Sequence, residues 1–311
     1  MMPALSIVTT LYCSERFVHA FYDRVKHAAA QVTDFFEVIF VNDGSPDGSR
    51  EKVLELVESD GRVVLVDLAR NFGHHQAIMV GLAHAKGDYV FLIDSDLEEE
   101  PETLHAFWEK ISHNPEIDVV YGIQIARKGG LFERLSGSAF YHLLNSLTKV
   151  PYPRNTTTAR LMRRAYVEAV LTFKEKSLDI WTIFVMVGFV QKGISLTKKS
   201  KGSSTYTFGK KVKMAIDIIT SVSHRPLYLI FLLGTVWLGI STINIMLILI
   251  NKWIYREQVA GWTSIMASIW LIGGVIIFLL GVIGIYLSRV FVETKNRPIA
   301  VVRKVYKKEI P

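Results

Sequence analysis

Short apolar runs alternate with stretches of helical periodicity along the first 123 residues. Five apolar runs of strand length are separated by amphipathic stretches, and these runs are residues 5–11, 36–42, 62–68, 88–94 and 117–123. Apolar strands separated by helices are typical of a parallel sheet with helices packed on its faces. The pattern therefore predicts an α/β domain, and ligands of such sheets bind at the carboxyl ends of the strands.

Two later segments are long and uncharged. Residues 227–250 carry no charged side chain, and neither do residues 259–288. Because a helix needs about 20 apolar residues to cross a bilayer, both segments predict transmembrane helices that form a hairpin. Residues 131–150 and 208–223 have an amphipathic pattern, which indicates helices that lie in the membrane interface or pack on the sheet.

The distribution of Lys and Arg predicts the orientation of the chain. Residues 198–225 contain seven of these side chains and residues 289–311 contain another seven, whereas the loop 251–258 contains two. Basic residues favour the cytoplasmic side, so a multi-pass protein with both termini in the cytoplasm is expected. Much of the net charge of +7 lies beside the predicted helices, which indicates attraction to anionic lipid headgroups.

Other sequence features exclude several classes of protein. The chain has no helix-turn-helix, zinc or RNP pattern, so nucleic acid is not expected as a partner. Cys13 is the one cysteine, which excludes an internal disulfide and suits a cytoplasmic location. The first residues lack the basic and apolar regions of a signal peptide.

Six carboxylates crowd into nine residues directly after the fourth apolar run. Asp94, Asp96 and Glu98 follow one another at a spacing of two, which places their side chains on one side of an extended or turning backbone. Carboxylate oxygens, together with water and phosphate, suit Mg²⁺ or Mn²⁺. The alternative is an acidic helix start, where the helix dipole favours negative charge. That alternative is the interpretation for the remaining three carboxylates, Glu99, Glu100 and Glu102.

Two further strand ends carry polar groups. Asp43 leaves the second apolar run into the turn DGSPDGS, and Arg70 follows the third run. Acidic residues at two strand ends of one sheet predict a crevice for a metal–nucleotide diphosphate. The alternative is an ordinary Asx turn with a helix cap at Asp47 or Ser49. His74 and His75 have no further His or Cys at metal spacing, so they are interpreted as structural.

Taken together, these motifs resemble the family-2 glycosyltransferases of the GT-A fold. The resemblance is carried by Tyr12, by Asp43-Gly44-Ser45 and by Asp94-Ser95-Asp96. The later segments FYHLLNSL, NTTTARLMRR, VGFVQKGISL, KGSSTYTFGK and ETKNRP, with the two membrane helices, are similar to the polyprenyl-phosphate glycosyltransferases. That group includes dolichol-phosphate mannose synthase and the bactoprenol-phosphate glucosyltransferases, and the resemblance covers nearly the whole chain.

The resemblance implies an activity and its setting. It implies inverting, metal-dependent transfer of a sugar from a nucleotide-diphosphate sugar to undecaprenyl or dolichyl phosphate, with Mg²⁺ or Mn²⁺ as cofactor. It places the catalytic domain at the cytoplasmic face of a bacterial inner membrane, in a homo-oligomer such as a tetramer. The expected organisation is a nucleotide-sugar-binding half, an acceptor half, two transmembrane helices and a basic tail, at residues 1–125, 126–225, 226–288 and 289–311.

The resemblance also implies roles for individual residues. Nucleotide binding is implied for Thr10, Tyr12, Asp43, Ser45, Arg70 and Asp94, and metal binding for Asp94, Asp96 and Glu98. Binding of the lipid phosphate is implied for Arg127, Lys201, Ser204 and Tyr206. The catalytic set is expected to be Asp94, Asp96, Arg160 and Asp179, with Arg160 near the donor and acceptor phosphates.

Three positions depart from the family pattern. Residues 10–14 replace the usual P-x-Y-N-E, Gln124 stands where an Arg is usual, and Thr158 stands where many relatives have an Asp. The last departure leaves Asp179 as a candidate base. Two alternatives stay open. The first is a glycosyltransferase of another type, such as a processive polysaccharide synthase or an enzyme with another lipid acceptor, and the second is a membrane-anchored nucleotide-sugar-binding scaffold with little or no activity. A Q-x-x-R-W motif, usual in the first alternative, is absent.

Overall fold

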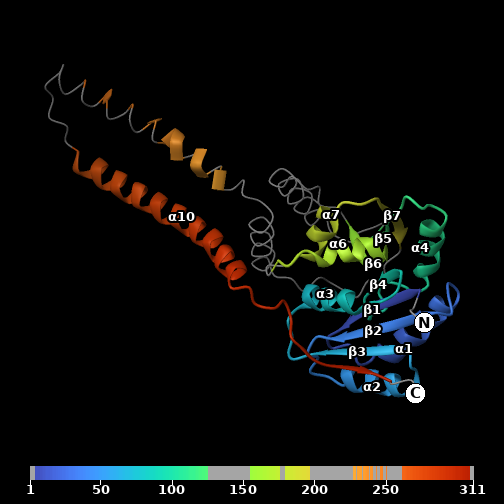
Figure 1. Cartoon of the computed structure of the whole chain (residues 1–311). Helices are drawn as coiled ribbons and strands as arrows, with labels where there is room; N and C mark the ends of the chain where they lie inside the picture. Colours follow the sequence, from blue (N-terminus) through green and yellow to red (C-terminus); the bar gives the residue numbers. More distant parts are fainter. Residues whose placement is uncertain are drawn as a thin grey trace. The chain divides into compact units, whose positions relative to one another are not determined.

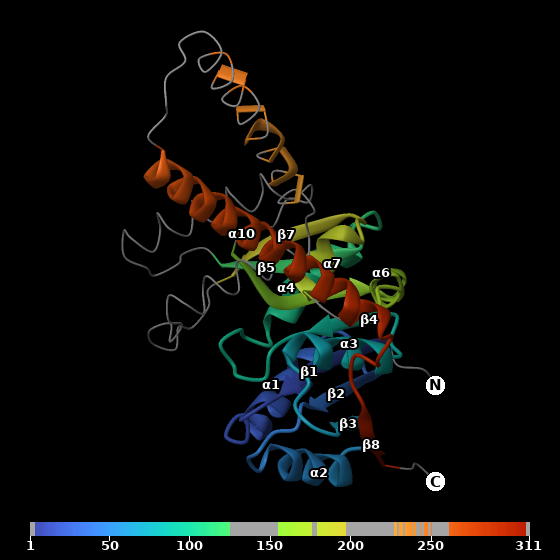
Figure 2. The ribbon, with the colours of Figure 1, turned by 90° about the vertical axis from the view of Figure 1, so that its left-hand side faces the viewer.

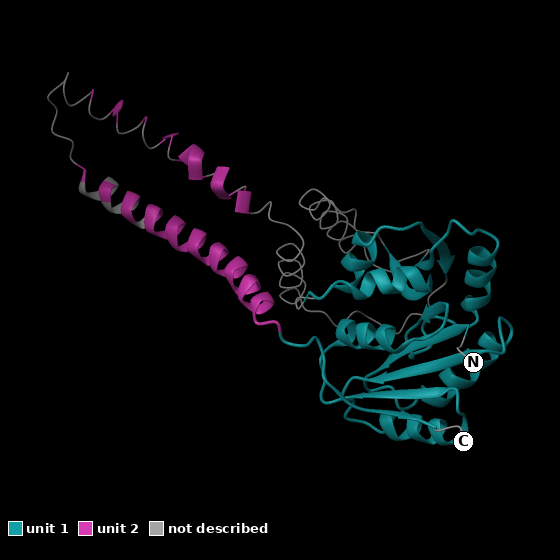
Figure 3. Ribbon diagram, in the orientation of Figure 1, with its two compact units in different colours: residues 1–141, 150–205, 297–311 teal, residues 142–149, 206–296 magenta. Residues whose placement is uncertain are grey.

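The computed structural model describes residues 4–124, 155–175, 179–196 and 261–308, and scattered positions between 227 and 250. The chain divides into two compact units (Figure 3). Unit 1 comprises residues 1–141, 150–205 and 297–311, and unit 2 comprises residues 142–149 and 206–296. The candidate site lies in unit 1, and the second long uncharged segment lies in unit 2.

Unit 1 is built on a mixed, mostly parallel sheet (Figure 1). In the described residues its strand order is β7-β5-β6-β4-β1-β2-β3-β8. The strands are β1 Leu5–Leu11, β2 Phe36–Asn42, β3 Val63–Leu68, β4 Tyr89–Leu92, β5 Val119–Gln124, β6 Thr156–Arg163, β7 Gln191–Leu196 and β8 Val302–Lys307. Strands β6 and β8 run against their neighbours, and the other pairs are parallel. The expected α/β, Rossmann-like arrangement of a GT-A domain is therefore confirmed.

Helices cover both faces of this sheet because successive strand residues point to opposite sides. Ile7 lies in a core cluster with residues of α1, α2 and α4, whereas Val8 lies in a second cluster with residues of α3, α6 and α7. The helices of unit 1 are α1 Val18–Ala30, α2 Ser49–Ser59, α3 His74–His84, α4 Thr103–Ser112, α6 Arg164–Leu171 and α7 Ile180–Met186. Two apolar layers thus fix the sheet and the loops at its edges.

The sheet is larger than the five apolar runs indicate. The expected acceptor half contributes β6 and β7, and β6 lies between β4 and β5. The segment expected as a basic tail forms β8, which pairs with β3 at the edge of the sheet. One sheet therefore includes residues from before and after the uncharged segments.

Unit 2 contains the helix α10, Trp262–Thr294. Within the described residues, Leu271–Thr294 is the one helix long and apolar enough to cross a membrane, with a mean hydropathy of 2.5. Its apolar side chains are exposed, as Ile277 and Phe278 illustrate. In the other uncharged segment, 227–250, the described positions are helical. The expected amphipathic helices at 131–150 and 208–223 lie outside the described residues.

Candidate active site

Polar side chains gather at the edge of the sheet where β1 to β4 end. Thr10 is near the end of β1, Asp43 directly follows β2, Arg70 follows β3 and Asp94 follows β4. Since these four strands are parallel, their carboxyl ends meet at one edge. Tyr12 lies just beyond β1, and its side chain is 54% exposed. The structure thus brings together residues that are far apart in the sequence.

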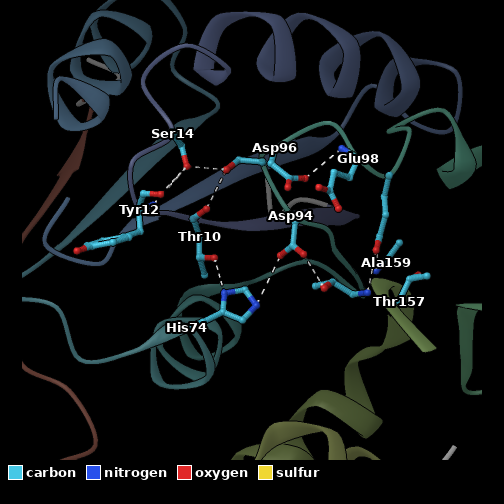
Figure 4. A network of polar contacts seen from close by, with 12 residues as sticks. Thr10, Tyr12, Ser14, His74, Asp94, Asp96, Glu98, Thr157 and Ala159 are labelled. Carbon is cyan, nitrogen blue, oxygen red and sulfur yellow. Dashed lines mark hydrogen bonds and ion pairs between the residues drawn. The ribbon is translucent and has the colours of Figure 1, made fainter. Parts of the chain in front are cut away.

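Asp94 is held from two sides at this edge (Figure 4). The Thr158 hydroxyl of β6 donates a hydrogen bond of 2.7 Å to Asp94 Oδ2. On the other side, His74 Nε2 lies 3.6 Å from Asp94 Oδ1, and His74 Nδ1 lies 3.1 Å from the Thr10 hydroxyl. The Asp94 side chain remains 27% exposed, so its carboxylate is oriented by the protein yet accessible to a ligand.

The next residues alternate between the interior and the edge. The hydroxyl of Ser95, which is buried, donates to the carbonyl of Thr10 at 3.0 Å and ties the end of β4 to β1. Asp96 Oδ1 accepts a hydrogen bond of 3.0 Å from the backbone N–H of Glu98. Leu97 has a φ of 59°, which closes this tight turn. Ser95 therefore points into the interior, between Asp94 and Asp96 at the edge of the sheet. This agrees with the prediction that residues two positions apart share a side.

Two of the remaining carboxylates have structural partners. Glu99 is buried, and its two oxygens accept hydrogen bonds from the backbone N–H groups of Thr158 at 3.1 Å and Ala159 at 2.6 Å. Glu102 accepts two hydrogen bonds from the guanidinium of Arg24. Glu99 is therefore more than an acidic helix start, because it fixes β6 at the residue that contacts Asp94.

The carboxylates are of the type that binds a divalent cation, but the described residues supply only part of a ligand set. Asp94 and Asp96 offer the hard oxygen ligands that Mg²⁺ and Mn²⁺ prefer. In the part of the chain that the structure describes, no group of three or more His, Cys, Asp or Glu side chains converges to hold a metal ion. Among the described residues, Asp94 and Asp96 would therefore share an ion with oxygens of a substrate or of water.

Asp43 organises the neighbouring loop. Its carboxylate is 3% exposed and accepts hydrogen bonds from the backbone N–H groups of Phe72 at 2.7 Å and Gly73 at 3.0 Å. Burial raises the pKa of Asp43 above its usual range, although the two hydrogen bonds act in the opposite direction. Gly44 approaches this loop so closely that a Cβ would lie 2.4 Å from the Asn71 nitrogen. The DGS turn thus packs directly against the loop after β3.

Ser45 and Asp47 join the loops after β1 and β2. The Ser45 hydroxyl accepts from the backbone N–H of Cys13 at 2.8 Å and donates to Asp47 Oδ1. Asp47 also accepts from the hydroxyl of Ser49 and from the backbone N–H of Glu15. Burial works to raise the pKa of Asp47, but these hydrogen bonds outweigh it and lower the pKa to about 2. The expected helix cap at Asp47 or Ser49 is wrong, because Gly48 is the N-cap of α2 and no side chain caps this helix; Asp47 instead links the loops.

Arg160 lies inside the domain rather than on an open surface. Its guanidinium is 3.7 Å from the ring centroid of Phe184 and 4.9 Å from that of Trp181, and the residue is 3% exposed. It also donates to the backbone carbonyls of Thr157 and Thr158 at 3.4 Å. Burial lowers the pKa of Arg160 to about 10. A positive charge is therefore buried on β6 itself, two residues from the Thr158 that contacts Asp94.

Asp179 precedes α7 and faces the first turn of α3. Its Oδ2 accepts a hydrogen bond of 2.6 Å from the Thr182 hydroxyl, and its Oδ1 lies 3.9 Å from His75 Nδ1. His75 also meets the ring of Trp181 edge to face at 6.3 Å. The adjacent His74 contacts Asp94, so the two carboxylates are linked through the start of one helix.

The sequence indicates a structural role for His74 and His75 and does not reveal their contacts with two of the three candidate catalytic aspartates, Asp94 and Asp179. The sequence position of His74 could have indicated these contacts, because His74 directly follows a strand-to-helix turn at the binding edge of the sheet.

Four residues with implied contacts to the lipid phosphate lie outside the described residues, and they are Arg127, Lys201, Ser204 and Tyr206.

Several known proteins are similar to this chain. A relative from Mycobacterium tuberculosis named as a glycosyltransferase is 44% identical over 97% of this chain and 88% of its own length. The prophage-derived bactoprenol glucosyl transferase of Shigella flexneri is 30% identical over 97% of this chain and 98% of its own length. A solved structure of glucosyl-3-phosphoglycerate synthase from Mycobacterium tuberculosis, in complex with Mn²⁺ and UDP-glucose, has 16% identity and a TM-score of 0.49, covering 70% of this chain and 77% of that one.

The family assignment follows from the match to a sequence model. The model for glycosyl transferase family 2 matches residues 6–171, which include all strands from β1 to β6 and the edge that carries Asp94. The matched region is more than half of the chain. The chain belongs to glycosyl transferase family 2 and is a transferase.

Proposed function

We propose that this transferase moves a sugar from a nucleotide-diphosphate sugar to a polyprenyl phosphate, with inversion at the anomeric carbon. The main structural support for this proposal is the position of Asp94. Its carboxylate is accessible at the edge where β1 to β4 end, and Thr158 and His74 orient it. Relatives named bactoprenol glucosyl transferase, matched over nearly their full length, support a polyprenyl phosphate as acceptor.

The donor nucleotide would lie across the loops after β1, β2 and β3. Exposed Tyr12 offers a ring on which a base can stack, and the Thr10 hydroxyl two residues earlier contacts His74. Asp43 and Ser45 are proposed to bind the nucleotide, and they also hold the loops beside it: Asp43 accepts from the Phe72 and Gly73 N–H groups, and Ser45 accepts from the Cys13 N–H. Arg70 carries positive charge at the same edge, where it can face a diphosphate.

Asp94 and Asp96 would hold a divalent cation together with the diphosphate oxygens of the donor, and Glu98 follows on the same turn. A bound Mg²⁺ or Mn²⁺ supplies stabilisation of the negative charge that develops on the leaving diphosphate. The protein contributes by orienting this ligand in advance, because Thr158 and His74 hold the Asp94 carboxylate in place before the metal or donor binds.

The acceptor needs positioning more than deprotonation. A phosphate monoester has a second pKa of about 6, so a polyprenyl phosphate is mostly a dianion at neutral pH. Its oxygen can attack the anomeric carbon in line with the departing nucleoside diphosphate without a dedicated base. Thr158 in place of an aspartate is compatible with such a reaction. Asp179 is the candidate should a base act, and Arg160 adds a buried positive charge on β6.

The lipid phosphate would be bound by basic and polar residues near the membrane segments. Arg127, Lys201, Ser204 and Tyr206 are proposed for this role on the strength of the sequence motifs. The remaining setting is proposed in the same way: two membrane helices, a cytoplasmic catalytic domain, a bacterial inner membrane and a homo-oligomer such as a tetramer. The exposed apolar helix α10 supports membrane association.

A donor screen tests this proposal. The purified chain in detergent is mixed with undecaprenyl phosphate, Mn²⁺ or Mg²⁺, and a panel of UDP-, dTDP- and GDP-sugars. Mass spectrometry is expected to find one lipid-phosphate-linked monosaccharide, whose formation stops when EDTA is added. Products on another lipid alone, or no product from folded protein with any donor, would refute the proposed acceptor or the proposed activity, respectively.

A further inference from the structure

The chain that follows α10 returns to the catalytic unit and extends its sheet. Strand β8 pairs antiparallel with β3 (Figures 1 and 2). Tyr306 lies opposite Leu65, and Lys304 lies opposite Asp67. Only seven residues separate the end of α10 at Thr294 from the start of β8 at Val302. The link between the apolar helix and the edge of the sheet is therefore short.

The start of this returning segment contacts the loop after β3. We call residues 69–73 the donor loop and residues 299–303 the tail brace. The backbone N–H of Ala69 donates to the carbonyl of Val301 at 2.9 Å, and the guanidinium of Arg303 donates to the carbonyl of Ala69 at 2.8 Å. Both backbone polar groups of Ala69 thus have partners in the tail brace.

The opposite end of the donor loop is fixed to the candidate site. The backbone N–H groups of Phe72 and Gly73 donate to Asp43, and His74 then begins α3 beside Asp94. The side chains of Phe72 and Ile299 pack against the same core cluster. The donor loop therefore lies between the tail brace and Asp43, with few positions at which it can move independently.

We propose that the tail brace positions the donor loop and thereby sets the affinity for the nucleotide sugar. Arg303 and Ile299 are positioning residues that act through Ala69 and Phe72, and they touch no reacting atom. This inference rests on the proposed function for its effect on the donor, whereas the ordering of the loop follows from the contacts alone. It also makes the segment after the apolar helix a part of the donor site.

The test compares two variants of the full-length chain. Ile299→Ala combined with Arg303→Ala removes the packing and the hydrogen bond to Ala69. The control, Lys308→Ala, removes a contact of Lys308 Nζ with the Glu58 carbonyl near the other end of β8. Hydrogen exchange of the amides in residues 69–73 is measured without substrate, and the KM values for donor and acceptor are measured separately.

The double variant is expected to exchange the Phe72 and Gly73 amides about tenfold faster and to raise the donor KM about fivefold, with the acceptor KM unchanged. The control is expected to match the parent chain. Unchanged exchange, or faster exchange with an unchanged donor KM, would overturn the inference. If the double variant fails to fold, Arg303→Ala alone is compared in the same way. A parent chain that transfers no sugar refutes the proposed function, whereas the exchange result still decides whether the brace orders the loop.

Discussion

At the scale of single residues, the six carboxylates after β4 divide by what each one contacts. Glu99 binds the backbone of β6, and Glu102 binds Arg24. Asp94 contacts Thr158 and His74, which leave part of its carboxylate exposed. Structural roles for some acidic residues therefore coexist with a candidate ligand site in the same short segment.

Thr158→Val tests whether the orientation of Asp94 matters for turnover. Valine keeps the shape of threonine but cannot donate to Asp94 Oδ2. Because a hydrogen bond to a charged group contributes about 1.5–3 kcal/mol, turnover is expected to fall by roughly 10- to 100-fold. Thr158→Ser should retain most activity. Equal activity of the valine and serine variants in initial-rate assays would show that this hydrogen bond is dispensable.

At the scale of elements, the site is made by loops that hold one another in place. Asp43 binds the loop after β3, and Ser45 with Asp47 binds the loop after β1. Each loop leaves a parallel strand at the same edge, so small shifts in one would be passed to the others. Substitutions that break these contacts should therefore lower both the free energy of unfolding and the affinity for the donor.

Gly44→Ala is expected to disturb two of these loops at once. Gly44 has a φ of 60°, and a Cβ there would lie 2.5 Å from the Arg70 carbonyl carbon. Gly188 also has a positive φ, 77°, but a Cβ there would meet no atom within 4 Å, which makes Gly188→Ala the matched control. The free energy of unfolding should fall by about 1–3 kcal/mol more for Gly44→Ala than for the control. Equal losses in denaturant titrations would argue against the close approach.

The Asp47 turn predicts a defined dependence of stability on pH. Its folded-state pKa, about 2, lies below the ordinary value of 3.8, so its ionised form stabilises the folded state. That contribution is complete above about pH 4 and is lost as the pH falls through about 2. The difference in unfolding free energy between the parent chain and Asp47→Asn should shrink over this window. A difference that stays constant from pH 5 to pH 2 would be inconsistent with the hydrogen bonds to Asp47.

At the scale of the whole molecule, one chain combines a transferase domain with an apolar helix whose side chains are exposed. Leu271–Thr294 has a mean hydropathy of 2.5, and none of its most apolar window is buried within the protein. Exposed apolar surface of this extent is stable only in lipid or against another apolar surface.

This helix predicts integral membrane association. Membranes from cells that express the chain are washed with 1 M salt and with alkaline carbonate, which remove proteins held by charge alone. The chain is expected to remain in the pellet after both washes and to dissolve in detergent. Release by salt would mean that its basic residues, rather than α10, hold it at the membrane.

The sequence predicts the parallel strands and the edge where ligands bind, because both predictions use only the order of neighbouring residues: the spacing of apolar residues and the polar residues that follow each strand. Asp43, Asp94 and Asp96 are placed by this reasoning. It misses Glu99, because an acidic helix start looks the same whether its carboxylate meets solvent or a distant strand. It also misses β8, a short basic strand whose partner lies more than 230 residues away in the chain. The burial of Arg160 depends on α7, whose rings come from a later part of the chain.

The central claim is that Asp94 and Asp96 hold the donor diphosphate through a divalent cation. Calorimetric titration of the detergent-purified chain with the nucleoside diphosphate of the active donor tests it most directly, with Mn²⁺ present or removed by EDTA. Binding is expected only with Mn²⁺ in the parent chain, and it should be lost in the variant that combines Asp94→Asn with Asp96→Asn while the variant still unfolds cooperatively. Equal affinity without the metal, or in the double variant, would contradict the account.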